Sequence, residues 1–306
     1  MIMYKKNING VLLLDKPIGL SSNKILQKVK KIFCAKKAGY IGTLDPLASG
    51  ILPICFGECT KFSDYLSNSN KRYYVIAKLG ITTSTYDSYG IILKNQIVKF
   101  SLFKLYESLK IIKNQLFQVT PSYSAVKYQG RPLYKYAIKN DFIPKILRKI
   151  KIHQLNLIKY NSKFIELDII CSKGTYIRRI IHDLGKLLQC GAHVIFLRRL
   201  QVHSYKIHET FTFEQLNYII KNDFNKNHNI ILNSFLLSIK NIFFTLPEVI
   251  IPNYNNIINI KNNIFYSYKK YPSIFRITIQ NNNKIFIMAK IDKKKNIFFY
   301  KFLNIN

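Results

Sequence analysis

The stretch Gly39-Tyr40-Ile41-Gly42-Thr43-Leu44-Asp45-Pro46-Leu47-Ala48-Ser49-Gly50-Ile51-Leu52 (GYIGTLDPLASGIL) places a single carboxylate among small and apolar residues. An Asp-Pro step favours a turn, because the Asp side chain hydrogen-bonds its own downstream backbone and Pro fixes φ. The three glycines allow backbone angles closed to other residues, which suits a tight loop. On this pattern alone, a structural role for Asp45 is favoured over a chemical one.

The chain is long, apolar and strongly basic. Its 306 residues are 48% hydrophobic, enough for a sizeable core and about two domains. Forty-eight Lys and Arg oppose fifteen Asp and Glu, and the formal net charge of +33 favours a polyanionic partner such as nucleic acid. A biased base composition could supply part of the lysine, so charge alone does not decide the partner.

Several functional classes lack their sequence signals. Charges or prolines interrupt every apolar stretch before the roughly 18 residues that a membrane-spanning helix needs. The N-terminal apolar run, 11–14, is too short for a signal-peptide core, so we expect a cytoplasmic protein without membrane attachment. Neither GxxxxGKS/T nor GxGxxG occurs, and the five cysteines form no CxxC pair. We therefore expect no cofactor, no metal, and reduced, mostly buried thiols.

Hydrophobic spacing predicts strands and helices in a mixed α/β order. Residues 11–14 and 164–171 are predicted to be strands, and the alternation in 73–79 puts Tyr73 on the same face as apolar side chains. Three helices are predicted: the first is capped by Ser21 or Ser22, the second begins at about Ser101, and the third has Thr175 as its N-cap candidate. Their inward residues are Ile25, Val29, Ile32 and Phe33; Leu102, Leu105, Leu109 and Ile112; and Ile177, Ile180, Ile181, Leu184 and Leu188.

Arg178 falls in the first turn of the third helix. A cation there opposes the helix dipole by roughly 0.3–1 kcal/mol. The position therefore suggests an anionic partner, and a solvated arginine is the alternative.

Two further segments have distinctive compositions. Residues 121–141 interleave tyrosines with lysine and arginine, the mixture that stacks on unpaired bases while holding phosphates, although an ordinary amphipathic surface has the same pattern. Past Pro247, the runs RITI, KIFIMAKI and NIFFYKF are separated by Asn-rich turns, which predicts a small β-rich unit. We place the domain boundary near residue 245.

Six segments together, in this order, resemble the TruB family of tRNA pseudouridine synthases. They are GVLLLDKP at 10–17, GTLDPLASGILP at 42–53, KRYYVIAKLG at 71–80, SYSAVKYQG at 122–130, CSKGTYIRRIIHDLG at 171–185 and GAHVIFLRRL at 191–200. Any one of them would be a weak signal. All six in register, over most of the chain, are specific.

The resemblance implies an α+β fold, with a catalytic domain (1–245) around a bent mixed or antiparallel sheet flanked by helices. It further implies a PUA-like RNA-binding domain at 246–306 and an arm at about 121–149 that grips the T-stem and loop of tRNA. The family's catalytic aspartate falls on Asp45, and its active-site tyrosine and arginine on Tyr73 and Arg178. Tyr176 and Leu197 fall on positions that line its uridine pocket.

The implied reaction is the isomerisation of uridine 55 to pseudouridine in the TΨC loop, which breaks the bond from C1′ to N1 and joins C1′ to C5. It needs no cofactor, and a carboxylate can attack either C1′ or C6. The Asp45 carboxylate must stay ionised while the bound base excludes water, and a guanidinium such as that of Arg178 would offset the desolvation. Tyr73 offers a ring on which the flipped uracil can stack and a phenol that can serve as general base near C5.

The sequence departs from the family pattern at Tyr40-Ile41, where the family usually has His-Thr. That histidine contacts RNA, so one substrate interaction is in question, and we still expect activity. A tRNA-binding or tRNA-folding protein with reduced catalysis is the alternative function. A guide-RNA-dependent synthase is a third, disfavoured by the DPLASG motif. We expect a monomer that needs no protein partner.

Overall fold

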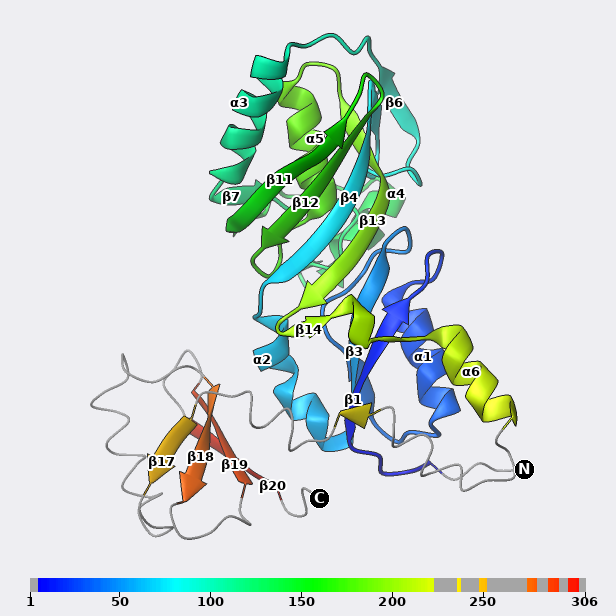
Figure 1. Cartoon of the computed structure of the whole chain (residues 1–306), viewed down its shortest axis with the longest axis vertical. Coiled ribbons are helices and arrows are strands. Elements are labelled where there is room, and N and C mark those ends of the chain that lie inside the picture. Colours follow the sequence, from blue (N-terminus) through cyan, green and yellow to red (C-terminus); the bar gives the residue numbers. More distant parts are fainter. Residues whose placement is uncertain are drawn as a thin grey trace.

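The computed structural model describes residues 5–222 and the short strands 236–237, 248–251, 274–279, 286–291 and 297–302. In these parts, no helix is both long and apolar enough to cross a membrane. Figure 1 shows a two-part body built around one continuous sheet, with helices packed on each part.

The central sheet is mixed. Its strand order is β11 (Ile152–Tyr160), β12 (Phe164–Cys171), β4 (Lys71–Leu79), β13 (Ala192–Val202), β3 (Ser49–Phe56), β1 (Gly10–Lys16) and β15 (Phe211–Thr212). Only β13–β3 and β1–β15 are parallel along this path. The short strands β2 (Ala38–Tyr40), β14 (Tyr205–Lys206) and β16 (Leu236–Leu237) join its sides. The predicted α+β class with a mixed sheet is confirmed.

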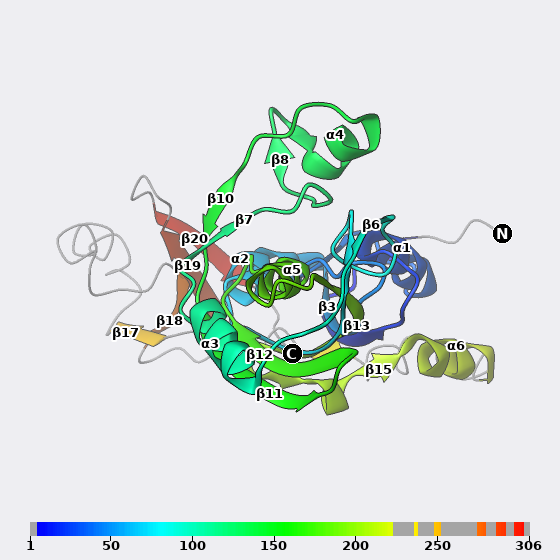
Figure 2. The same cartoon turned by 90° about the horizontal axis from the view of Figure 1, so that it is seen from above.

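Four longer helices cover this sheet: α1 (Ser22–Ile32), α3 (Leu102–Lys113), α5 (Ile177–Leu187) and α6 (Phe213–Asn222). Seen from above, the half of the sheet that contains β11, β12 and β13 curves around α5, with α3 beside it (Figure 2). Shorter elements lie in the connections: the helix α2 (Ser63–Ser67) and the 3-10 helices η1 (Gly57–Phe62) and η2 (Ile207–Glu209).

Burial explains the two kinds of strand pattern. Every residue of β3 and nearly all of β1 are buried, so both read as continuous apolar runs. In β4, by contrast, alternate residues are buried, and Tyr73, Val75, Ala77 and Leu79 share the inner face as predicted. At Gly50, a Cβ would lie 2.2 Å from the backbone oxygen of Arg199, so the close β3–β13 approach requires glycine.

Two details of the helix predictions are wrong. Leu102 is half exposed, because it is the first residue of α3 and only Leu105, Leu109 and Ile112 of the predicted stripe face the core. Thr175 is not the N-cap of α5: the cap position is Tyr176, and the Thr175 hydroxyl donates to the Ser172 carbonyl. The cap Ser21, the start of α3 at about Ser101 and the apolar stripe of α5 are confirmed, and the Ser101 side chain is the N-cap of α3.

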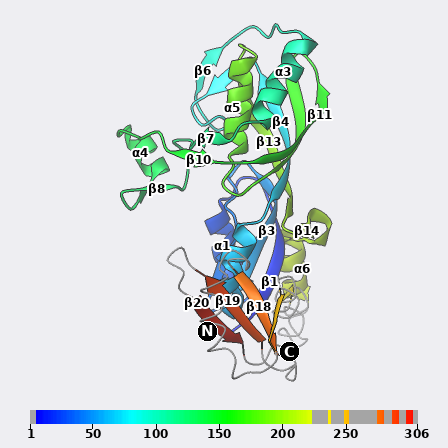
Figure 3. The same cartoon turned by 90° about the vertical axis from the view of Figure 1, so that its left-hand side faces the viewer.

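An arm projects away from the sheet (Figure 3). Its stem is the ribbon of β7 (Phe117–Val119) and β10 (Leu147–Lys149), and its tip carries β8 (Lys127–Tyr128), β9 (Arg131–Pro132) and α4 (Leu133–Lys139). A second hairpin, β5 (Ile81–Thr83) with β6 (Ile92–Asn95), follows β4.

The described C-terminal strands form a sheet of their own. The order is β17 (Glu248–Ile251), β18 (Ile274–Ile279), β19 (Phe286–Ile291) and β20 (Ile297–Phe302). The described strands contain the run RITI in full and most of the runs KIFIMAKI and NIFFYKF, all predicted to be β-rich. The predicted domain boundary near 245 lies outside the described residues.

Candidate active site

The Asp45 loop connects β2 to β3 and is held from both ends. The Ser22 hydroxyl, at the start of α1, donates to the Leu44 carbonyl at 2.9 Å and accepts from the Leu44 N–H at 2.8 Å. The Ala48 N–H donates to the Asp45 carbonyl at 3.0 Å, which closes the expected turn. The loop backbone is therefore fixed without using the Asp45 side chain.

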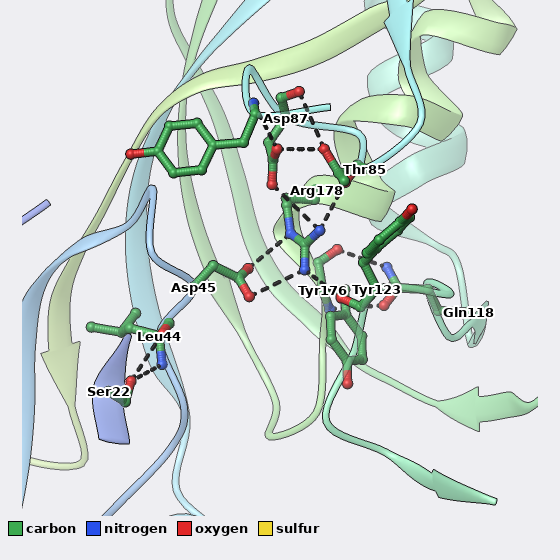
Figure 4. A network of polar contacts seen from close by, with 10 residues as sticks. Ser22, Leu44, Asp45, Thr85, Asp87, Gln118, Tyr123, Tyr176 and Arg178 are labelled. Carbon is green, nitrogen blue, oxygen red and sulfur yellow. Dashed lines mark hydrogen bonds and ion pairs between the residues drawn. The ribbon is translucent and has the colours of Figure 1, made fainter. Parts of the chain in front are cut away.

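The Asp45 carboxylate instead meets Arg178 in a two-pronged ion pair (Figure 4). Nε of Arg178 donates to one carboxylate oxygen at 2.8 Å, and Nη2 donates to the other at 3.1 Å. This fork is the strong geometry for an arginine–carboxylate pair. The side chain of Arg178 is only 4% exposed, whereas that of Asp45 is 33% exposed.

The other donors of Arg178 are also occupied. Nη1 donates to the Thr85 carbonyl at 2.8 Å, and Nη2 donates to the Tyr123 carbonyl at 3.0 Å. A second carboxylate, that of the buried Asp87, lies 3.4 Å from Nη1. Asp87 is itself held by the Thr85 hydroxyl at 2.5 Å. These contacts fix the position of the guanidinium. They therefore also determine which face of the Asp45 carboxylate stays open.

That free side faces a cavity of about 910 Å³. Asp45, Tyr73, Tyr176 and Leu197 all line it, and Arg178 lies behind Asp45. The structure therefore brings together all five residues that the sequence singled out, from a loop, two strands and the start of a helix.

Tyr73 lies on β4, directly opposite Arg199 of β13. Burial raises the pKa of Tyr73, and the nearby Arg199 guanidinium opposes this effect only in part. The phenol therefore keeps its proton near neutral pH, which favours a stacking surface over a general base.

Tyr176 is oriented through its backbone. Its N–H donates to the side-chain oxygen of Gln118 at 2.8 Å, and the Gln118 amide donates back to the Tyr176 carbonyl at 3.1 Å. Gln118 belongs to the stem of the arm, on β7. The pocket wall and the arm are thus joined at this residue.

Asp87 and Arg199 were missed by sequence reasoning. Arg199 is fully buried and lines the cavity, and it donates to the Ile51 carbonyl at 2.8 Å and to the Gly42 carbonyl at 2.9 Å. It thus ties both ends of the Asp45 loop to β13. Arg199 belongs to the motif LRRL and directly follows Arg198. Only the register of β13 shows that Arg199 lines the cavity, whereas Arg198 pairs with Asp15 at 2.6 Å.

Lys16 and Tyr40 lie in strands that adjoin the Asp45 loop. The buried Lys16 donates to the Pro17 and Leu20 carbonyls, both at 2.7 Å, and so holds the turn between β1 and α1. Burial lowers its pKa to about 8, an effect that the nearby Asp45 opposes. Tyr40 is half-buried against the core and pairs with Ile54.

The thiols are buried as expected for four of the five cysteines, and Cys34 is half-buried.

Comparison with known proteins finds family models and relatives that match most of the chain. The model of the TruB family pseudouridylate synthase N-terminal domain matches residues 30–177, and that of the tRNA pseudouridylate synthase B C-terminal domain matches 178–243. The tRNA pseudouridine synthase B of Buchnera aphidicola (subsp. Acyrthosiphon pisum) is 45% identical over 98% of this chain and 97% of its own length. That of Shigella boydii is 52% identical over 71% of this chain and 69% of its own.

Among solved structures, a chain from a Cbf5-Nop10-Gar1 complex shares the fold. Its TM-score is 0.64 at 21% identity, over 96% of this chain and 84% of that one. The match in fold and the high identity to relatives over nearly the whole length confirm what the six motifs indicated, and the chain belongs to the TruB family of pseudouridine synthases.

Proposed function

We propose that this chain isomerises uridine to pseudouridine at position 55, in the TΨC loop of tRNA, with Asp45 as the nucleophile. The observation that carries the proposal is the Asp45–Arg178 fork at the wall of the cavity, with one face of the carboxylate open. Relatives named tRNA pseudouridine synthase B support tRNA as the substrate.

In this proposal Arg178 keeps Asp45 ionised when the bound nucleotide displaces water. Removing a carboxylate from water favours its neutral form, and an adjacent guanidinium opposes that change. Because Arg178 is held by two carbonyl groups and a second carboxylate, it does not need to reorganise when the substrate binds.

Tyr73, Tyr176 and Leu197 would enclose the flipped uracil. An extruded base is normally held by stacking on aromatic or apolar side chains, which offsets the few kcal/mol needed to unstack it. During the reaction the bond from C1′ to N1 breaks, the base turns, C1′ bonds to C5, and a proton leaves C5 while N1 gains one. Attack of Asp45 on C1′ and attack on C6 both fit a carboxylate nucleophile.

The remaining parts of the chain have roles that follow from this substrate. The arm at 121–149 would grip the T-stem and loop, and residues 246–306 would form the PUA-like RNA-binding domain beside a catalytic domain at 1–245. We expect a cytoplasmic monomer.

Unmodified tRNA transcript incubated with the purified protein, followed by carbodiimide mapping, tests the proposal. Pseudouridine at the T-loop uridine is the expected result. Tight tRNA binding without any pseudouridine would instead support the alternative, a tRNA-binding or tRNA-folding protein.

A further inference from the structure

The lining of the cavity is strongly cationic. Six basic residues line it, and Asp45 is the only acidic residue among the described residues that do so. We call these six the cationic wall: Lys71, Arg148, Lys149, Lys151, Lys173 and Arg199.

The carboxylates of the molecule do not neutralise this wall. Within the described part of the chain, the ion pairs join Asp or Glu to other cations, and none includes a member of the cationic wall. These pairs are Lys61–Glu58, Arg72–Asp168, Arg131–Asp141, Arg178–Asp45, Arg178–Asp87, Arg179–Asp183 and Arg198–Asp15. Asp45 is already bound by Arg178, so the cavity has a large uncompensated positive charge.

The inner part of the wall is buried. Lys71 is 5% exposed and Arg199 is 1% exposed. Lys71 donates to the Ser67 and Ser69 carbonyls, both at 2.5 Å, and so uses two of its three N–H groups. Burial and the like charge of Arg199 lower the pKa of Lys71 to about 8. Adjacent buried cations without a carboxylate are costly, and an anionic ligand would remove that cost.

The outer part of the wall is exposed at the mouth of the cavity. Arg148 lies against the Gly174 backbone, since a Cβ at Gly174 would be 3.3 Å from its Nη1. Lys173 donates to Asn68, which joins the loop before α5 to the segment after α2. The guanidinium of Arg148 forms no hydrogen bond within the described residues, and Arg148 lines the same cavity as Tyr176, one of the residues proposed to hold the base.

We propose that the cationic wall is a phosphate subsite, which binds a backbone phosphodiester next to the target uridine through Lys71, Arg148 and Lys173. This inference rests on the proposed function and adds to it a site for the phosphate. A cavity of about 910 Å³ is near the upper end for small-ligand pockets, so it has room for more than a base. Phosphate oxygens accept charge-assisted hydrogen bonds from both lysine and arginine.

The subsite predicts that protein cations and one particular phosphate are energetically coupled. We would measure the affinity of the Asp45→Asn protein, which binds without turnover, for a T-arm RNA hairpin. In separate hairpins, a neutral methylphosphonate replaces the phosphodiester on the 5′ or the 3′ side of the target uridine. The same measurements are made after adding Arg148→Gln or Lys173→Gln to that protein.

A matched control is Lys159→Gln. Lys159 is an exposed lysine at the far end of β11, eight residues from Lys151 and so about 26 Å away along the strand. The substitution Lys159→Gln removes one positive charge, as the two test substitutions do, at a position outside the cavity.

One of the two methylphosphonates should weaken binding about tenfold in the parent protein and in Lys159→Gln, as expected for a lost charge-assisted hydrogen bond. In Arg148→Gln and Lys173→Gln, binding should already be weaker, and the same methylphosphonate should then have little further effect. Equal losses in all four proteins would overturn the proposal.

Inorganic phosphate, added at constant ionic strength, separates the two sources of the ligand. It should compete with the hairpin in the parent protein. Competition by inorganic phosphate without any methylphosphonate effect would mean that the wall binds free phosphate, and would overturn the assignment to RNA. Product formation by the wild-type protein is scored separately: pseudouridine without coupling overturns the subsite alone, and coupling without pseudouridine overturns the proposed function alone.

Discussion

Two arginine–aspartate forks in this protein have nearly the same geometry and opposite burial. In Arg178–Asp45, Nε and Nη2 donate to the two carboxylate oxygens at 2.8 and 3.1 Å. In Arg72–Asp168, the corresponding distances are 2.9 and 2.7 Å. The first pair hides its arginine and exposes its carboxylate, whereas in the second the arginine is 45% exposed and the aspartate is 8% exposed.

The two pairs show that an arginine fork does not by itself decide whether a carboxylate is open to a cavity. Asp168 lies in the middle of β12 with its charge turned toward Arg72, and it does not line the cavity that Asp45 faces. Asp45 lies in a loop whose backbone is tied down by Ser22 and Arg199, so one face of its carboxylate remains available. A buried arginine paired with an exposed carboxylate leaves the carboxylate accessible to a substrate. A buried carboxylate paired with an exposed arginine contributes only to the stability of the fold.

Replacing each aspartate gives the largest expected contrast. Asp45→Asn should reduce pseudouridine formation by at least roughly 10⁴-fold, the scale of removing a catalytic nucleophile, while tRNA affinity stays within a small factor. Asp168→Asn should leave the rate constant nearly unchanged and lower the folding stability instead. Single-turnover rates and denaturant unfolding measure the two effects, and substantial turnover by Asp45→Asn would exclude it as the nucleophile.

Replacing each arginine by lysine should give a smaller contrast of the same kind. Arg178→Lys keeps the charge but loses the fork and the bonds to Thr85 and Tyr123, so we expect a loss of about 10²–10³-fold in single-turnover rate. Arg72→Lys is the control. Because its pair is partly solvent-exposed, it should cost less than about 1 kcal/mol in stability and leave turnover intact. Wild-type turnover in Arg178→Lys would make Arg178 merely structural.

Asp87→Asn should have an intermediate effect, because Asp87 contacts Arg178, the arginine of the first pair, and has no contact with Asp45 of its own. The change removes one of the two negative charges around Arg178 and leaves the Asp45 contact in place. We expect roughly a tenfold lower rate, in line with the loss of one charge–charge interaction with Arg178. A drop in tRNA affinity with an unchanged rate would assign Asp87 to binding instead.

Tyr73→Phe should have the smallest effect on rate, less than about tenfold, because the buried phenol keeps its proton and the ring remains. Tyr73→Leu should lose more, since stacking of a base on an aromatic ring contributes about 1–3 kcal/mol. The measurement is the single-turnover rate of each variant relative to the wild-type rate, taken between pH 6 and 9. A large, pH-dependent defect in Tyr73→Phe would restore the general-base role.

The sequence predicted the parts of the fold and site that depend on local spacing or on motifs. The alternation in β4, the apolar stripe of α5 and the cap Ser21 follow from periodicity and local hydrogen bonding. The meeting of Asp45 with Arg178, 133 positions apart, came from the family resemblance and the need for a counter-charge.

Asp87 and Arg199 could not be predicted, because their roles depend on contacts between distant segments. Arg199 faces Tyr73 only through the register of β13 with β4, which shifts at two irregular positions. Asp87 reaches Arg178 only because the segment before β6 bridges to Val194 of β13. Neither arrangement leaves a repeating pattern in the residues near it.

A crystal structure of the Asp45→Asn variant bound to a T-arm RNA hairpin tests the central claim most directly. The account predicts the target uridine flipped into the cavity against Tyr73, with its C1′ or C6 about 3–3.5 Å from the side chain at position 45, on the side away from Arg178. A uridine that stays stacked in the RNA loop, or that lies closer to another carboxylate than to position 45, would contradict it.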